Sequence, residues 1–180
     1  MTNPDPMKIF GLYDATPADA SQLAEFGART FRESFADDNT DEDMKLHLES
    51  AWSPDKQLAE IQNPDIDTLI YADGAGRWLG FAQLRAGKVS DGVPRDGSIE
   101  LWRFYVDKPF HGQGVAAGLM KGAKLRAKKR GANTLWLGVW ERNERAKAFY
   151  AKHGFQKVGS QVFVVGMDPQ TDHVMLCPLA

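Results

Sequence analysis

The segment that most constrains the fold is a strand, a glycine-containing loop and a helix in direct succession. Ser98–Val106 is rich in β-branched and aromatic residues, which predicts a strand, and Val115–Arg130 carries an apolar stripe at helical spacing. A strand at Thr134–Val139, a helix at Glu144–Lys152 and a strand at Gln156–Val165 are predicted to follow. This β–α–β–α–β order predicts one mixed sheet with helices packed on it.

The rest of the chain alternates between helical and extended patterns. Pro17 follows Thr16, a favoured N-cap, and Thr40 precedes three acids, so both threonines predict helix starts. A third, shorter helix is predicted to end at Ile61. Strands are predicted at Ile9–Tyr13, Thr68–Tyr71, Trp78–Leu84 and Asp172–Leu179, with turns at Asp73–Gly76 and Met167–Thr171.

Length and composition are those of a single globular domain. The chain has 180 residues, 43% of them apolar and 26% charged, which excludes disordered and collagen-like classes and predicts one domain over residues 1–180. No apolar run approaches the roughly 18 residues of a membrane span, and the N-terminus lacks a secretion signal. We therefore expect a cytoplasmic protein without membrane contact.

Cysteine and histidine usage argues against a metal centre. Cys177 is the only cysteine, which excludes an internal disulfide and a cysteine-rich zinc site. The four histidines lack the paired spacing typical of metal ligands. We expect no metal cofactor, and we expect Cys177 to pack in the core.

Charge is distributed unevenly along the chain. Residues 1–70 contain fifteen acids and five bases, whereas residues 111–157 contain two acids and eleven bases. The asymmetry fits two ligand surfaces, one for an anion near the second region and one for a cation near the first. Two solvated helical faces also explain it, and charge alone favours that explanation.

Gly112 and Gly114 stand just before the helix that begins at Val115. Glycine lets the backbone approach a ligand, and the free N–H groups and dipole of a helix start suit a phosphate. On spacing alone, a simple turn explains the two glycines better. The loop is neither a Walker loop nor a dinucleotide-binding G-x-G-x-x-G, since Ala117 stands at the third glycine position.

Two separated motifs resemble those of the GNAT acyl-CoA N-acyltransferases. His111–Ala116 is similar to the family's pyrophosphate-binding loop, usually Arg/Gln-x-x-Gly-x-Gly/Ala. The second motif of the family is matched by Asn143, Ala146, Phe149-Tyr150 and Gly154-Phe155. The resemblance implies an α/β (α+β) fold, with a mixed, mostly antiparallel sheet of six to seven strands and helices on both faces. It also implies direct transfer of an acetyl group from acetyl-CoA to an amine.

The resemblance also implies which residues bind acetyl-CoA. The end of one strand is implied to supply main-chain groups for the pantetheine arm and the thioester. An asparagine is implied to form a hydrogen bond with pantetheine, and His111–Ala116, which we call the glycine loop, to hold the pyrophosphate. His111 stands where the family usually has Arg or Gln, so a phosphate contact and a loop histidine without contact both remain open. The implied residues are Phe104, Tyr105, Val106, His111, Gly112, Gln113, Gly114, Val115, Ala116 and Asn143.

Acetylation of an amine requires a base and an acid. An alkylammonium, with a pKa of about 10.4, must lose a proton before it attacks, and the departing thiolate must gain one. The resemblance implies Glu100 as the base, directly or through water, and Tyr150 as the acid. The alternatives are pairing of Glu100 with Arg103 or another base, a helix N-cap for Asn143 and a packing role for Tyr150.

A narrower resemblance concerns the acceptor. Several segments are similar to those of bacterial spermidine/spermine N-acetyltransferases of the Pai type. They are Thr30–Phe35, Asn39, Glu42-Asp43, Leu48, Trp136–Glu141, Asn143-Glu144 and Gln170–Asp172. This implies a small-molecule amine acceptor, a polyamine in particular. A dense acidic group would attract its positive charges, although helix capping also explains those acids. The group comprises Asp37, Asp38, Asp41, Glu42 and Asp43.

Other functions stay open as alternatives. The sequence does not distinguish a polyamine acceptor from the amine of a protein N-terminus, a lysine side chain or an antibiotic. A CoA-binding sensor without turnover is a second class, and nucleic-acid binding through Lys121–Arg130 conflicts with the acidic net charge of −2. We assign the five tryptophans to the core. Because the superfamily is commonly dimeric, we expect a homodimer.

Overall fold

The structure, a computed structural model, describes residues 11–180 and contains a single seven-stranded sheet in that range. The strand order is β1-β2-β3-β4-β5-β7-β6, and every neighbouring pair is antiparallel except β4 and β5. This confirms the mixed, mostly antiparallel sheet. The strands are β1 (Leu12–Asp14), β2 (Ile66–Ala72), β3 (Trp78–Arg85), β4 (Ser98–Val106), β5 (Thr134–Trp140), β6 (Gln156–Val165) and β7 (Asp168–Pro178).

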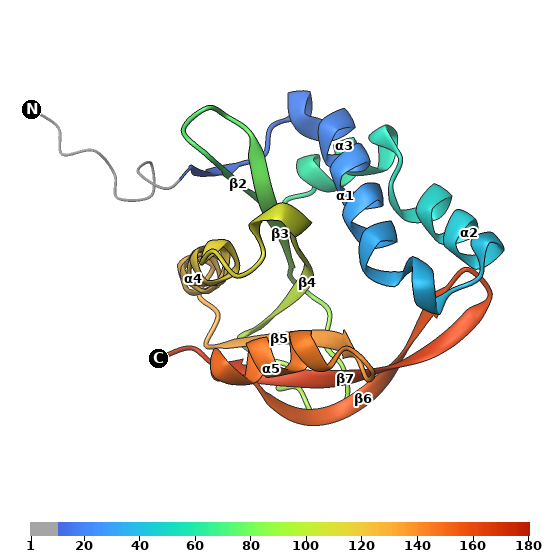
Figure 1. The fold of residues 1–180 in the computed structure, drawn as a ribbon. Helices are drawn as coiled ribbons and strands as arrows, with labels where there is room; N and C mark the ends of the chain where they lie inside the picture. Colours follow the sequence, from blue (N-terminus) through green and yellow to red (C-terminus); the bar gives the residue numbers. More distant parts are fainter. Residues whose placement is uncertain (1–10) are drawn as a thin grey trace, which may run out of the picture.

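Helices cover both faces of the sheet, each face over its own apolar core (Figure 1). One core lies under three N-terminal helices and the other under two later ones. Within residues 11–180, no helix has the length and apolar composition needed to cross a membrane. The helices are α1 (Ala20–Phe35), α2 (Asp41–Ala51), α3 (Pro54–Gln62), α4 (Val115–Lys129) and α5 (Glu144–Lys152), with short 3-10 turns at Pro17–Asp19, Ala36–Asp38 and Lys108–Phe110.

Side-chain caps fix the starts of two helices, and the one at Thr40 confirms the sequence prediction. The side chain of Thr40 accepts a hydrogen bond from the N–H of Asp43 (3.1 Å) at the start of α2. Ser53 does the same for Lys56 (3.2 Å) at the start of α3. Each cap satisfies an N–H that the helix itself leaves free, which fixes where the helix begins.

The predicted apolar stripe of α4 is its buried face. Val115, Leu119, Ala123 and Ala127 are all buried against the sheet. A Cβ at Gly122 would lie 2.3 Å from a methyl group of Leu12, so only glycine lets the helix pack this closely against β1. The small residues of the stripe therefore set the position of α4, and with it the loop that precedes the helix.

The C-terminal hairpin differs from the sequence expectation. The turn predicted over Met167–Thr171 is only Gly166-Met167, and β7 begins at Asp168, paired with Val165. Gly166 has a φ of 60°, which suits a tight two-residue connection. An oxygen of Asp43 accepts a hydrogen bond from the N–H of Met167 (2.7 Å) and fastens this turn to α2. Of the first predicted strand, residues 9 and 10 lie outside the described residues, and β1 starts at Leu12.

The feature that positions the site is the divergence of β4 from β5. Their pairing ends at Glu100 opposite Trp136, although β4 continues to Val106. The register of β3 against β4 shifts beside Gln83, where Trp102 has no partner. Such a bulge bends the strand, so β4 leaves β5 beyond this point. Backbone groups along the freed edge of β4 are then available to a ligand.

Candidate active site

A cleft opens where β4 and β5 separate, and we call it the strand cleft. It has a volume of about 260 Å³ and lies between the second half of β4, the end of β5, α5 and the glycine loop. Most of the residues expected to bind acetyl-CoA line it. These are Phe104, Tyr105, Val106, His111, Gly112, Ala116 and Asn143, and Tyr150 lines the same cleft.

The glycine loop has the geometry of an anion-binding helix start. Gly112 and Gly114 have φ values of 76° and 82°, and Gly114 is the N-cap of α4. A Cβ at either position would meet no atom within 4 Å, so positive φ, rather than crowding, requires glycine there. The first N–H groups of α4 have no carbonyl partner within the helix, and its dipole adds a partial positive charge. A diphosphate fits this loop.

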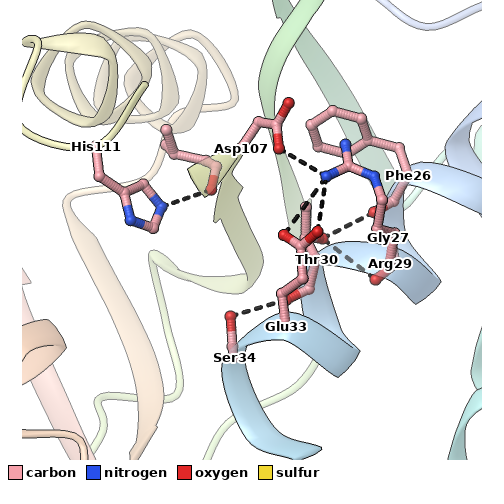
Figure 2. Close-up of polar contacts among 9 residues, drawn as sticks. Phe26, Gly27, Arg29, Thr30, Glu33, Ser34, Asp107 and His111 are labelled. Atoms are coloured by element: carbon pink, nitrogen blue, oxygen red, sulfur yellow. Dashed lines mark hydrogen bonds and ion pairs between the residues drawn. The ribbon is translucent and has the colours of Figure 1, made fainter. Parts of the chain in front are cut away.

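Two side chains of the loop are used to hold its shape. The ring Nε2 of His111 donates to the carbonyl oxygen of Val106 (2.8 Å). The dashed line from the His111 ring in Figure 2 marks this bond. The amide of Gln113 donates to the carbonyl oxygen of Pro109 (2.7 Å). The His111 ring thus ties the loop to the end of β4, and its contact with phosphate stays a prediction.

An ion pair joins the same loop to α1. Nη1 of Arg29 lies 2.7 Å from a carboxylate oxygen of Asp107 and 3.2 Å from one of Glu33 (Figure 2). Asp107 directly follows β4, so the pair connects the helices on one face with the loop that leads to α4 on the other. This contact helps to hold the mouth of the strand cleft.

Asn143 and Tyr150 lie at opposite ends of the cleft wall formed by α5. The side chain of Asn143 accepts from the N–H of Ala146 (3.1 Å), so it caps α5 and also lines the cleft. Tyr150 packs edge-on against Phe104, with ring centroids 6.2 Å apart. Burial raises the pKa of Tyr150 above its ordinary value, and nearby Tyr105 adds to the rise. The phenol therefore keeps its proton at neutral pH.

A second cavity lies between α1, α2, α3 and the strands, and we call it the aromatic pocket. It has a volume of about 290 Å³. Its apolar walls are aromatic, and its polar groups include His47, Lys56, Arg103 and Asp172. Trp102 and Trp140 are half-buried wall residues rather than the core residues expected from sequence. The aromatic wall residues are Phe31, Phe35, Trp52, Trp102, Tyr105, Trp140 and Phe163.

The two cavities meet at a shared wall. Five residues line both of them, which places the aromatic pocket directly beside the point where β4 and β5 diverge. Four of the five are aromatic, and the fifth is an arginine. The shared residues are Phe35, Trp102, Arg103, Tyr105 and Trp140.

Asp172 is the carboxylate of the aromatic pocket. It lies on β7 opposite Trp140, is 7% exposed, and accepts no hydrogen bond from any side chain of residues 11–180. Burial raises its pKa to about 6. A Cβ at Gly138 would lie 3.0 Å from its Oδ2, so glycine at that position leaves room for the carboxylate.

Glu100 lies outside both cavities. Its carboxylate is buried and receives two hydrogen bonds from Arg85, the shorter of them 2.6 Å. Burial raises the pKa of Glu100, while the charge of Arg85 opposes that rise. The ion pair expected as the alternative is therefore present, with Arg85 in place of Arg103. Arg103 pairs instead with Glu60.

The acidic segment between α1 and α2 lies outside the walls of both cavities. Asp43 is the member with defined contacts, since it bonds Thr40 and the N–H of Met167, and these bonds lower its pKa. Nearby Asn39 accepts from Gln170 (2.7 Å), a residue of the aromatic pocket. Across residues 11–180, His, Cys, Asp and Glu side chains form no group of three or more that fits a metal ion.

Comparison with known proteins decides the family. A family model described as the acetyltransferase (GNAT) family matches residues 28–155. The chain belongs to this family. An uncharacterized N-acetyltransferase of Lactobacillus delbrueckii subsp. lactis is 32% identical over 157 residues, which cover 87% of this chain and 90% of the relative. One from Mycobacterium tuberculosis (strain H37Rv) is 33% identical over 162 residues, which cover 88% and 96%.

Solved GNAT structures share the fold. The PaiA N-acetyltransferase of Thermoplasma acidophilum, solved with coenzyme A, has a TM-score of 0.74 at 21% identity and covers 93% of this chain and 97% of that one. A GCN5-related N-acetyltransferase of Rhodopseudomonas palustris has a TM-score of 0.73 at 21% identity, with 94% and 96% covered. The protein is thus an acetyl-CoA-dependent N-acetyltransferase of the GNAT type.

Two charged residues of the aromatic pocket, Asp172 and Arg103, are not predicted from the sequence as pocket residues. Asp172 belongs to the segment Gln170–Asp172, which resembles the Pai-type enzymes. No sequence pattern, however, marks it as a buried carboxylate that faces a pocket. The sequence suggests Arg103 only as a partner for Glu100. Both positions depend on pairing between distant strands, and the one local signal is a charged residue within an otherwise apolar strand.

Proposed function

We propose that this protein transfers the acetyl group of acetyl-CoA to a small primary amine bound in the aromatic pocket. One observation carries the proposal: the strand cleft and the aromatic pocket share a wall at the divergence of β4 and β5. Tyr150 faces the first cavity and Asp172 the second. An acyl donor in the cleft and an amine in the pocket would meet at this junction.

The proposed donor site uses the residues expected from the resemblance. The N–H groups of Gly112–Ala116 and the start of α4 would bind the pyrophosphate of CoA. The free edge of β4 at Phe104, Tyr105 and Val106 would pair with pantetheine amides and supply an N–H for the thioester oxygen. Asn143 would bond the pantetheine arm from the opposite wall of the cleft.

The proposed chemical step is direct transfer. The neutral amine nitrogen attacks the thioester carbonyl carbon, so that a C–N bond forms and the C–S bond breaks. The substrate ammonium has first lost one proton to the base, which passes it to solvent, and the nitrogen loses a second proton as the amide forms. The thiolate takes a proton from Tyr150, and the second nitrogen proton restores that of Tyr150. In this step Tyr150 acts as the acid, because its raised pKa keeps it protonated until charge develops on sulfur.

We assign the acceptor-side base to Asp172, directly or through water. Its carboxylate lies in the pocket without a side-chain partner among residues 11–180. A pKa of about 6 leaves it ionised yet more basic than an ordinary aspartate at neutral pH. Glu100, the base implied by the resemblance, is engaged with Arg85. Its role stays a prediction, and the pH profiles of Asp172 and Glu100 variants separate the two candidates.

Polyamines are one candidate class of acceptor. The acidic segment at 37–43 supports them through long-range attraction, and the hydrogen bond from Gln170 to Asn39 connects this segment with the pocket. The solved PaiA structure supports only the fold at its level of identity. Inside the pocket itself, two cations face a single carboxylate, and these charges favour an acceptor that is not purely cationic.

The test is release of CoA thiol from acetyl-CoA, with the N-acetylated product identified by mass spectrometry. The amines are spermidine, spermine, a diamine, several amino acids, a lysine peptide and an aminoglycoside. We expect one thiol released per N-acetylated amine with at least one small amine. Binding of acetyl-CoA without turnover of any amine would contradict the proposal and favour a CoA-binding sensor.

Three further expectations stay predictions. These are a single domain over residues 1–180, a homodimer and a cytoplasmic location. Sedimentation of the purified protein checks the second of them.

A further inference from the structure

Arg103 is a buried cation with donors to spare at the junction of the two cavities. Its side chain is 9% exposed and lines both of them. Nη1 donates to Glu60 and to Gln83 (2.7 Å). Of the five N–H donors of an arginine, those on Nε and Nη2 find no acceptor in residues 11–180. These three N–H groups are free for a ligand in the pocket.

The guanidinium is also held rigidly in place. Its central carbon lies 4.3 Å from the ring centroid of Trp52 and 3.9 Å from that of Trp102. The two indoles and the pair of bonds from Nη1 fix the plane of the group. A fixed planar fork matches the two oxygens of a carboxylate or the oxygens of a phosphonate.

Lys56 brings a second cation to the same pocket. It lies in the first turn of α3, its side chain is exposed, and no carboxylate of residues 11–180 lies within 4.0 Å of its Nζ. His47, also in the wall, is neutral at pH 7 because burial and the charge of Arg103 lower its pKa to about 4. The charged groups that face the pocket are therefore Lys56, Arg103 and one carboxylate, Asp172.

Asp172 and Arg103 both act on one hydroxyl. Burial raises the pKa of Tyr105 to about 12, the charge of Arg103 lowers it, and the charge of Asp172 raises it. Tyr105 thus lies within electrostatic range of an anion on one side and a cation on the other. Glu60 pairs with Arg103 but does not line the pocket. The lining therefore offers the several ammonium groups of a polyamine only one carboxylate, Asp172, and places Lys56 and Arg103 beside it.

We propose that the acceptor is a zwitterion: a primary amine that binds at Asp172 and carries an anionic group that binds at Arg103 and Lys56. This rests on the proposed function and narrows it to amino acids and related aminated acids with a compact apolar or aromatic body. The aromatic walls of the pocket bind that body. The shared chemistry is one ammonium and one carboxylate or phosphonate.

Matched substrates test the proposal. At saturating acetyl-CoA, kcat/KM is measured for phenylalanine, leucine and 4-aminobutyrate, for the amides of these acids, for the amines that lack the carboxyl group, and for spermidine. We expect about a tenfold or larger preference for at least one free acid over its amide, the scale of a charge-assisted hydrogen bond. Preference for spermidine or for the amines without a carboxyl group would overturn the proposal.

Charge variants locate the anion site. Lys56→Gln is expected to raise the KM of the preferred acid several-fold and to leave its amide unchanged. The matched control is Lys45→Gln, an exposed lysine of α2 outside the pocket whose one ion-pair partner within residues 11–180 is Glu49, at 3.9 Å. Arg103→Lys keeps the charge and loses the fork, so the same acid-specific loss is expected. An equal loss for acid and amide in both variants would contradict the proposal.

A binding measurement separates this inference from the proposed function. Trp52, Trp102 and Trp140 line the pocket, so ligand binding to the CoA-bound protein is followed by tryptophan fluorescence. Saturable binding of an amino acid, weakened in Lys56→Gln but not in Lys45→Gln, supports the zwitterion site even if no amine turns over. Turnover of amines without any such acid-specific binding overturns the site and leaves acetyl transfer standing.

Discussion

Among single residues, the buried carboxylates of Asp172 and Glu100 differ in their surroundings. Asp172 faces the aromatic pocket with no side-chain partner among residues 11–180, and Glu100 is engaged with Arg85. Both have pKa values raised by burial. The difference lies in access, because only Asp172 has open space beside its oxygens. An acid with open space beside it is available to substrate, whereas a paired one stabilises the sheet.

The first prediction concerns pH. Asp172 is protonated below a pKa of about 6, so kcat/KM for the amine should fall as pH decreases through that value. Asp172→Asn should lower kcat/KM about 100-fold or more and remove the limb at about pH 6, within the usual range for a lost acid–base group. The check is a pH profile of thiol release between about pH 5 and 9, which spans both sides of that pKa.

Glu100→Gln serves as the comparison for that profile. We expect it to keep the limb near the pKa of about 6 assigned to Asp172 and to lower stability, because it weakens a buried pair with Arg85. A profile in which Glu100→Gln, and not Asp172→Asn, loses the limb would return the base role to Glu100.

A second residue-scale prediction concerns His47 and stability. Its folded pKa of about 4 lies below the ordinary value of 6.5, so between these values the unfolded chain binds a proton that the folded chain does not. This histidine therefore lowers the free energy of unfolding as pH falls from 6.5 to about 4. Asp172 acts in the opposite direction, since its raised pKa favours proton uptake by the folded state.

The variant His47→Phe separates the contribution of His47 to the pH dependence of stability from that of the other groups. His47→Phe preserves the stack on Phe31, whose ring centroid lies 4.2 Å away, and removes the titration. Urea unfolding at about pH 7 and about pH 4.5 should show a smaller loss of stability on acidification in the variant than in the wild type. An equal loss in both proteins would contradict the pKa shift.

Some residues that line the two cavities can be predicted from local sequence, and others cannot. Asn143 and Tyr150 can be predicted because they lie in one short segment with recognisable spacing, and both line the strand cleft. Asp172 and Arg103 gain their surroundings from strands and helices far along the chain. Burial by distant elements is set by the whole fold, and no local pattern reports it.

Among the elements, the glycine loop (His111–Ala116) has the backbone conformation on which the proposed binding of CoA depends. Gly114 has positive φ and no neighbour near its missing Cβ. Gly114→Ala should therefore cost about 1–2 kcal/mol of stability through backbone strain alone. It should also raise the Kd for CoA about tenfold, because the N–H groups of the helix start turn away from the phosphates.

Gly87→Ala is the matched control for this prediction. Gly87 has a φ of 77°, and a Cβ at this position would also meet no atom within 4 Å, but it lies after β3 and away from the strand cleft. We expect a similar stability loss and an unchanged Kd, with Kd measured by calorimetry. A rise in Kd of the same size in both variants would mean that strain, and not loop geometry, weakens binding.

Most elements can be predicted from the sequence because their ends carry local signals. The cap Thr40 and the apolar stripe of α4 are local, and the structure confirms the helices they mark. The start of β7 escapes prediction because residues 168–171 include proline and polar side chains, which favour a turn. Pairing with β6 makes them extended instead.

At the scale of the whole molecule, the sheet is held across its middle by only a few pairs between β4 and β5. A ligand in the strand cleft bridges the glycine loop of one half and α5 of the other. CoA at about 100 times its Kd should raise the free energy of unfolding by about 2.7 kcal/mol. Urea unfolding with and without CoA measures this, and an unchanged midpoint at that concentration would contradict binding to the folded cleft.

Acetyl transfer at the junction of the two cavities requires a proton from the phenol of Tyr150, and Tyr150→Phe removes that proton. Thiol release with the preferred amine is measured for this variant and for Tyr13→Phe, an exposed tyrosine of β1 outside both cavities. We predict a fall in kcat of about 100-fold or more for Tyr150→Phe, with the KM for acetyl-CoA nearly unchanged and Tyr13→Phe fully active. Full activity of Tyr150→Phe would contradict the account.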